Sequence, residues 1–224
     1  MNYTLLYIAL AVAVVHWIAA TKEWKILVYI TKPAVMILLI LWVVLDRHYP
    51  GYLLVWVSIA LTLSMAGDVF LMLPDRWFLP GLVAFLLAHV AYIIGLLQVW
   101  PALNIPTLIV AVLVTVTSYQ IYRGIAAGLK RQGRESMRLP VLAYTVVISV
   151  MLFSALAAVT RRSETMPALL MAAGALLFYL SDTWNAWHRF VEPLSHRHIK
   201  VMASYHLGQI LLTIGALLRY KIDA

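Results

Sequence analysis

Two aspartates stand inside long apolar stretches of this 224-residue chain, Asp68 in LTLSMAGDVFLMLP and Asp182 in ALLFYLSDTWNAW. An aspartate at the centre of a membrane helix costs about 2.5–3.5 kcal/mol even on lenient scales, so it indicates a function by default. Two carboxyl groups in one site of low dielectric do not both ionise readily, so one of them keeps a proton. A proton donor beside a carboxylate suits acid-catalysed cleavage through an oxocarbenium-like state. We therefore predict that both aspartates are catalytic.

The rest of the chain is strongly apolar, with 64% hydrophobic residues, 12% charged residues and a mean hydropathy of +0.91. Apolar runs of about twenty residues recur along it and are typical of helices that cross a bilayer. They are too long and unbroken for the alternating strands of an outer-membrane barrel. The sequence predicts an all-α, polytopic membrane helix bundle of about eight transmembrane helices, forming one integral membrane domain over residues 1–224 with no soluble domain. The predicted spans are 3–20, 26–45, 52–73, 79–99, 104–122, 139–160, 166–188 and 199–219.

The positive charges indicate an orientation in the membrane. Of the 17 Lys and Arg residues, eleven fall on the side opposite the N terminus and five on the N-terminal side. The positive-inside rule then makes the richer side cytoplasmic and places both termini outside the cytoplasm. We predict an integral protein of a bacterial inner membrane. The first span has no Lys or Arg ahead of it, so we expect it to be retained rather than cleaved as a signal.

The net charge of +8 follows from these cations at the span ends, so we predict no nucleic-acid partner. The same cations attract anionic lipid headgroups, and membrane lipid is the expected surrounding. The absence of cysteine excludes disulfides and a thiolate nucleophile. The sequence indicates no oligomeric state.

Polar residues of several spans fall at one depth when position is counted at about 1.5 Å per residue. They lie toward the cytoplasmic ends of their spans, whereas the opposite halves of the last four spans carry little comparable polarity. This pattern predicts one polar chamber that opens toward the cytoplasmic leaflet. The residues predicted to bind substrate in it, beside the two aspartates, are Lys32, His89, Tyr92, Tyr144, Ser181, Asn185, Tyr205 and Gln209.

Each of these residues also has a purely structural interpretation. Lys32 can extend to the interface along its apolar stem or pair with an aspartate. Tyr144 and Tyr205 fit an interfacial aromatic belt, and His89 fits a neutral core histidine bonded to a carbonyl. The shared depth does not by itself place the two aspartates within reach of each other.

A metal site and a transport function are the two alternatives to acid catalysis. His188, His196, His198 and His206 gather around the last cytoplasmic loop, where Asp68 or Asp182 would complete a metal site, but no H-E-x-x-H pair occurs. We therefore predict no metal and no cofactor.

The G-D and S-D pairs recur 114 residues apart, a weak internal repeat of the kind found in transporters. A transporter or binding protein for lipids or small molecules remains the alternative.

Five segments spread in order from residue 31 to residue 212 resemble one family: TKPAVMILLI, SMAGDVFLML, FLPGLVAFLLAHVAYIIG, GALLFYLSD and YHLGQILL. The ordered set is similar to the YhhN-like lysoplasmalogenase family of multispan membrane proteins. This resemblance implies an enzyme that hydrolyses the vinyl-ether bond of lysoplasmalogens. The implied products are a fatty aldehyde and glycerophosphoethanolamine or glycerophosphocholine, and the implied partner is a lysophospholipid substrate.

With that substrate, the resemblance implies roles for the chamber residues. One aspartate protonates the alkene, and the other stabilises the cation and directs water. Lys32 and the basic rim hold the substrate phosphate. The glycerol oxygens or the water are positioned by Tyr144, Tyr205, His89 and Gln209.

Overall fold

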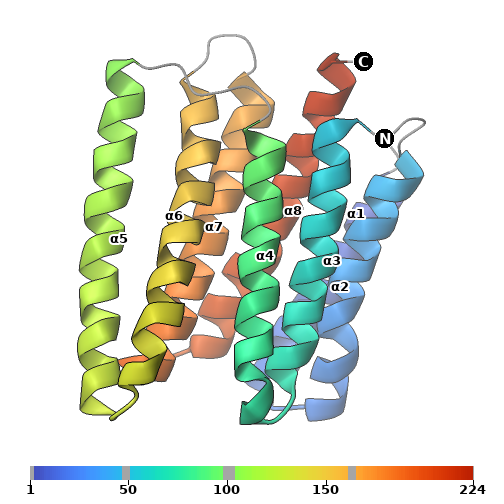
Figure 1. Ribbon diagram of the computed structural model, residues 1–224. Coiled ribbons are helices and arrows are strands. Elements are labelled where there is room, and N and C mark those ends of the chain that lie inside the picture. The colour runs from blue at the N-terminus through green and yellow to red at the C-terminus, as the bar shows by residue number, and fades with distance from the viewer. Residues whose placement is uncertain (1–2, 47–50, 98–103, 161–164, 224) are drawn as a thin grey trace.

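The computed structural model describes residues 3–46, 51–97, 104–160 and 165–223. Within these residues the chain forms eight long helices that pack side by side along a common direction (Figure 1). Each helix is long and apolar enough to cross a membrane. The predicted all-α, polytopic membrane helix bundle is confirmed. The N-terminal and C-terminal ends lie at the same end of the bundle (Figure 1), as an even number of antiparallel crossings requires.

The helices begin and end close to the predicted spans, with two short 3₁₀ turns between them. Their bounds are α1 Thr4–Thr21, α2 Lys25–Asp46, α3 Tyr52–Met72, η1 Asp75–Trp77, α4 Phe78–Leu96, α5 Ile105–Arg131, η2 Glu135–Met137, α6 Arg138–Val159, α7 Thr165–Phe190 and α8 Arg197–Asp223. Outside the described residues lie positions 98 and 99 of the fourth predicted span and three cations counted on the N-terminal side, Arg47, Arg161 and Arg162.

The largest difference from the predicted spans is at α5, which was expected to end at residue 122 and continues to Arg131. Arg123 interrupts the apolar pattern there, but Ile125 and Leu129 lie one turn apart on the same face of the helix. Both are buried in a small apolar cluster that also contains Phe190 at the end of α7. This packing extends the helix beyond its hydrophobic span.

Helices α7 and α8 form an antiparallel hairpin whose backbones approach unusually closely. A methyl group added to Gly174 of α7 would lie 2.7 Å from the carbonyl oxygen of Gly208 of α8. Small residues at helix interfaces permit such close packing in membranes. The hairpin therefore presents the polar end of α7, which carries Asp182, beside the start of α8, which carries Tyr205.

Candidate active site

A cavity lies in the half of the bundle away from the termini, between the ends of α3, α5 and α7 and the beginnings of α2, α4, α6 and α8. Counted with its open outer part, its volume is about 1190 Å³. Both polar side chains and Leu, Ile and Phe side chains line the cavity. Seven of the predicted site residues line it, namely Lys32, Asp68, Tyr144, Ser181, Asp182, Asn185 and Tyr205.

Asp68 lies near the end of α3 with both carboxylate oxygens occupied. Its Oδ1 lies 3.0 Å from Nζ of Lys32 on α2, and the Tyr205 hydroxyl on α8 donates a 2.7 Å hydrogen bond to Oδ2. The Asp68 side chain is only 1% exposed. A buried carboxylate is tolerated when a countercharge and hydrogen bonds satisfy it in this way. Lys32 is therefore the charge partner of Asp68 rather than a lysine extended to the interface.

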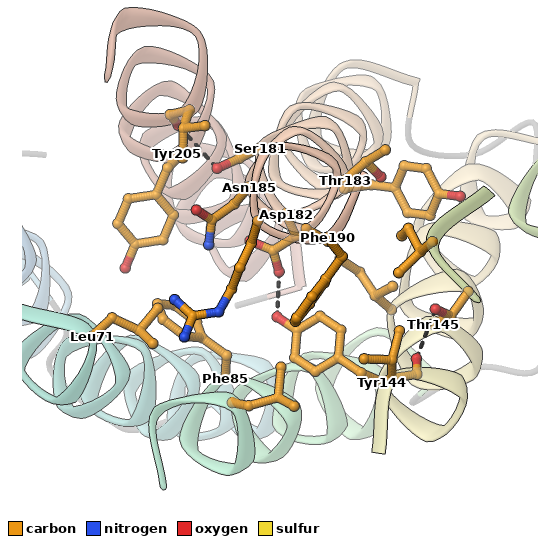
Figure 2. A pocket seen from close by; sticks show the side chains of 18 of the residues that line it. Leu71, Phe85, Tyr144, Thr145, Ser181, Asp182, Thr183, Asn185, Phe190 and Tyr205 are labelled. Carbon is orange, nitrogen blue, oxygen red and sulfur yellow. Dashed lines mark hydrogen bonds between the residues drawn. The ribbon is translucent and has the colours of Figure 1, made fainter. Parts of the chain in front are cut away.

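Asp182 lies on α7 in different surroundings. The Tyr144 hydroxyl on α6 donates a hydrogen bond to its Oδ2 (Figure 2), and Nε2 of His89 on α4 lies 3.6 Å from the same oxygen. No Lys or Arg among the described residues forms an ion pair with Asp182. Its side chain is 17% exposed and faces the cavity. Asp182 is thus the more accessible of the two acids.

His89 lies behind Asp182 and does not line the cavity. Its Nδ1 lies 2.5 Å from the carbonyl oxygen of Phe85. Because a carbonyl oxygen only accepts hydrogen bonds, Nδ1 carries a hydrogen, and Nε2 of the neutral ring has a lone pair. At 3.6 Å from Oδ2 of Asp182, Nε2 makes no hydrogen bond with the described residues. His89 is therefore a close polar neighbour of Asp182 but not its hydrogen-bond partner.

Tyr92 and Gln209, which were predicted to bind substrate, are not among the residues that line this cavity. The Tyr92 hydroxyl donates a 2.5 Å hydrogen bond to Oε1 of Gln209, and Nε2 of Gln209 donates to Oγ of Ser64 at 3.1 Å. All three side chains are buried. They satisfy one another and connect α4, α8 and α3, which is a structural role.

Ser181 and Asn185 line the cavity on α7, on either side of Asp182 along the chain (Figure 2). The Ser181 hydroxyl donates a 2.9 Å hydrogen bond to the Val201 carbonyl oxygen. It therefore joins α7 to α8 rather than facing a ligand with a free donor. Asn185 lies one turn beyond Asp182, toward the outer part of the cavity.

The histidines of the alternative metal site do not converge. Nδ1 of His188 accepts a 3.0 Å hydrogen bond from the Leu194 amide. His206 is buried, where its Nδ1 accepts from Nε1 of Trp17 on α1 at 3.1 Å. No three His, Cys, Asp or Glu side chains in the described part of the chain come close enough to hold a metal ion.

Two cavity residues were missed by sequence reasoning as parts of the site. Arg189 near the end of α7 and Arg197 at the start of α8 line its outer part, although in the sequence they stand out only as cations that set the topology. One signal was available, because Arg189 follows Asp182 by seven residues, which places both on one face of a helix.

The comparisons with known proteins identify the family. The chain matches the YhhN family over residues 27–216. It belongs to the YhhN family. Lysoplasmalogenase TMEM86B of Rattus norvegicus is 32% identical over 205 residues, which cover 90% of this chain and 77% of the relative. Its Homo sapiens counterpart of the same name is 35% identical over 161 residues, or 70% of this chain and 62% of the relative.

A bacterial relative carries a similar name. Lysoplasmalogenase of Mycobacterium tuberculosis is 31% identical over 166 residues, which cover 71% of this chain and 59% of the relative. The match thus spans less than two thirds of the human and mycobacterial proteins. No solved structure matches the chain. The YhhN-family region contains every residue of the cavity described above.

Proposed function

We propose that this YhhN-family chain is a lysoplasmalogenase, a membrane hydrolase that cleaves the vinyl-ether bond of lysoplasmalogen-type lysophospholipids. The relatives that carry this name support the reaction class. The observation that carries the proposal is the arrangement of Asp68 and Asp182. Both line one cavity, and one is paired with lysine while the other is not.

Hydrolysis begins when an acid protonates the outer alkene carbon of the vinyl ether. We assign this step to Asp182, which faces the cavity and has no Lys or Arg partner among the described residues. The alkene electron pair forms the new C–H bond, and the proton leaves the carboxyl oxygen. The carbon attached to the ether oxygen becomes an oxocarbenium ion, a charge that carboxylates stabilise in a low dielectric.

Water then adds to the oxocarbenium carbon and loses a proton to a carboxylate, giving a hemiacetal. The hemiacetal hydroxyl then loses its proton as its oxygen forms the aldehyde double bond. The bond to the glycerol oxygen breaks, and that oxygen takes up a proton. Asp68 is suited to stabilise the cation and orient the water because Lys32 and Tyr205 hold it as an anion. Tyr144 orients Asp182 through its hydrogen bond.

The apolar side chains of the cavity lining support a substrate with a single hydrocarbon chain. Among them are Leu82 and Phe85 of α4, Ile121 and Ile125 of α5 and Ile148 of α6. Binding sites for lipids and other small molecules combine such apolar walls with a few polar groups. The vinyl ether joins the apolar chain to the polar glycerol, so its cleavage needs both kinds of lining residue in one cavity.

Hydrolysis in heavy water tests the reaction directly. Purified protein in detergent micelles, supplied with a lysoplasmalogen in D₂O, should release a fatty aldehyde with one deuterium on the carbon next to the carbonyl. That deuterium is the solvent proton delivered to the alkene. Authentic aldehyde incubated with the Asp182→Asn variant controls for exchange. A folded wild-type protein that releases no aldehyde would refute the assignment and favour the transport alternative.

We also propose that the cavity faces the cytoplasmic leaflet of a bacterial inner membrane, with both termini outside. The charge bias across the membrane supports this orientation. Because the chain has no cysteine, a single Ser136→Cys variant, at an exposed position between α5 and α6, can be labelled specifically. A membrane-impermeant maleimide should react with it only after the inner membrane is opened. Labelling in sealed cells would reverse the orientation.

A further inference from the structure

Arg189 is held at the outer part of the cavity, where part of its side chain remains without a partner. Its Cζ lies 3.8 Å from the centre of the Phe78 ring, and its Nη2 lies 3.1 Å from Oδ1 of Asp75. The Asp75 side chain is 80% exposed, so water screens this ion pair strongly. The buried Nε of Arg189 has no hydrogen-bond partner among the described residues. The guanidinium is therefore fixed in place by Phe78, and within the described part of the chain only Nη2 among its terminal nitrogens has an ionic partner.

Arg197 is the first residue of α8, and it lines the same cavity from the other helix of the hairpin. The first turn of α8 contains no acidic residue, although the N-terminal end of a helix favours negative charge. Within the described part of the chain Arg197 forms no ion pair. Two guanidinium groups and a helix N terminus thus converge on one cavity, an arrangement that an anion would neutralise.

The spacing between Asp182 and Arg189 along α7 is suited to a ligand that carries an ether and a phosphate a short distance apart. Arg189 follows Asp182 by two helical turns, about 10 Å along the axis. The Arg189 guanidinium lies over the ring of Phe78, the first residue of α4, which lines the same cavity as Asp182. In a lysophospholipid, only the glycerol separates the phosphate from the ether oxygen. A phosphate held by the arginines would place that ether beside Asp182.

Lys32 is not available for the phosphate role that the family resemblance implied. Its Nζ pairs with Asp68 at 3.0 Å, and its side chain is only 9% exposed. A lysine that left this pair would leave a buried carboxylate uncompensated, which is strongly unfavourable. Arginine is in addition the better match for phosphate, because its planar group donates two parallel hydrogen bonds.

We propose that Arg189 and Arg197 form a subsite for the phosphodiester group of a single-chain phospholipid. The subsite sets the position of the substrate in the cavity. The phosphate lies at the outer end, the ether at Asp182 and the hydrocarbon chain among the apolar side chains. This assignment rests on the proposed function for its substrate, but phosphate binding can be measured without turnover. The two can therefore fail separately.

The test compares two ligands that the enzyme cannot hydrolyse, in micelles of a phosphorus-free maltoside detergent. One is a saturated alkyl-ether lysophosphocholine, and the other is the matching alkylglycerol, which lacks the phosphate. Replacing Arg189 or Arg197 by Gln should raise the Kd of the phosphate ligand about tenfold each, the usual effect of losing a charge-assisted hydrogen bond. The Kd of the alkylglycerol should not change.

Arg131→Gln is the matched control, because it removes the same charge from an exposed position at the end of α5 outside the cavity. It should leave both Kd values as in the wild type. Arg189→Lys retains the charge and should recover part of the loss, which separates lost recognition from misfolding. Equal weakening of both ligands, an equal effect of Arg131→Gln, or no weakening at all would overturn the subsite.

A further comparison separates the two sources of phosphate. A two-chain phosphatidylcholine or inorganic phosphate, added as competitor, should displace the lysophosphocholine poorly, because neither matches both the arginines and the single-chain cavity. Competition as strong as that of the lysophospholipid itself would mean that the arginines bind membrane or free phosphate generally. That result would overturn their role in positioning the substrate.

Discussion

Asp68 and Asp182 line the same cavity in opposite electrostatic surroundings. Asp68 is 1% exposed and pairs with Lys32 and Tyr205. Asp182 is 17% exposed and has a tyrosine and a histidine as its partners. Each acid receives one tyrosine hydroxyl, from α8 for Asp68 and from α6 for Asp182, so the decisive difference is the lysine.

This difference shows how one fold can give two like residues different roles. A buried carboxylate beside a lysine is stable as an anion, whereas one without a full countercharge favours its protonated form. The two acids echo each other in sequence, as G-D and S-D pairs 114 residues apart. Their partners also come from corresponding helices, α2 and α8 for Asp68 and α6 and α4 for Asp182. Because these partners differ in residue type, the echo does not make the two sites equivalent. The comparison yields four predictions.

The largest effect is expected at Asp182. Asp182→Asn removes the proton donor and should lower kcat for aldehyde release about a thousandfold, within the range for a lost general acid. The thermal midpoint in detergent should hardly change, because the Tyr144 hydroxyl can donate to the amide oxygen instead. Aldehyde release by the folded variant at more than a tenth of the wild-type rate would exclude Asp182 as the acid.

At Asp68 the comparison predicts a large loss of stability as well as of activity. Asp68→Leu or Lys32→Met leaves one buried charge unpaired and should reduce the free energy of unfolding by about 3–5 kcal/mol. The double variant Lys32→Met, Asp68→Leu should recover most of this stability but no activity. Reversible unfolding in mixed micelles measures both. Additive losses in the double variant would show that the pair is not coupled.

The two tyrosines offer a matched test of intermediate size. Tyr144→Phe should lower kcat about tenfold by releasing Asp182 from its orienting hydrogen bond, a loss typical of one such bond to a charged group. Tyr205→Phe should act mainly on stability, since Lys32 still holds Asp68. Kinetics and unfolding are measured on both variants. Identical behaviour of the two would remove the distinction between the acids.

The smallest effect is expected at Ser181, which adjoins Asp182 but bonds to the backbone of α8. Ser181→Ala should reduce the free energy of unfolding by about 1 kcal/mol, the usual net value of a hydrogen bond. Both kcat and KM should remain close to those of the wild type. A rise in KM without loss of stability would instead return Ser181 to the substrate-binding role that the sequence suggested.

The bundle and the depth of its polar residues could be predicted from the sequence. Hydropathy marks the spans because each helix must present apolar side chains to lipid. Depth follows from counting residues along a helix, since the rise per residue is constant. This is why Asp68, Asp182, Lys32, Tyr144 and Tyr205 were all expected at one level and do line one cavity.

Which of these residues meet could not be read from the sequence. Residues at one depth can face lipid, another helix or the cavity, and the choice depends on how each helix rotates against its neighbours. Close packing such as that at Gly174 and Gly208 sets this rotation, and it depends on side chains far apart in the chain. His89 was expected in the chamber and lies behind Asp182.

The sequence by itself determined that this protein crosses the membrane repeatedly and carries two acids at one depth, because hydrophobicity and helical rise are properties of the chain taken in order. The tertiary structure decided that Lys32 belongs to Asp68, that Asp182 has no such partner, and that two arginines complete the cavity. Those pairings depend on distances between helices. In a low dielectric, the electrostatic energy of a charged group depends mainly on the groups nearest to it in space.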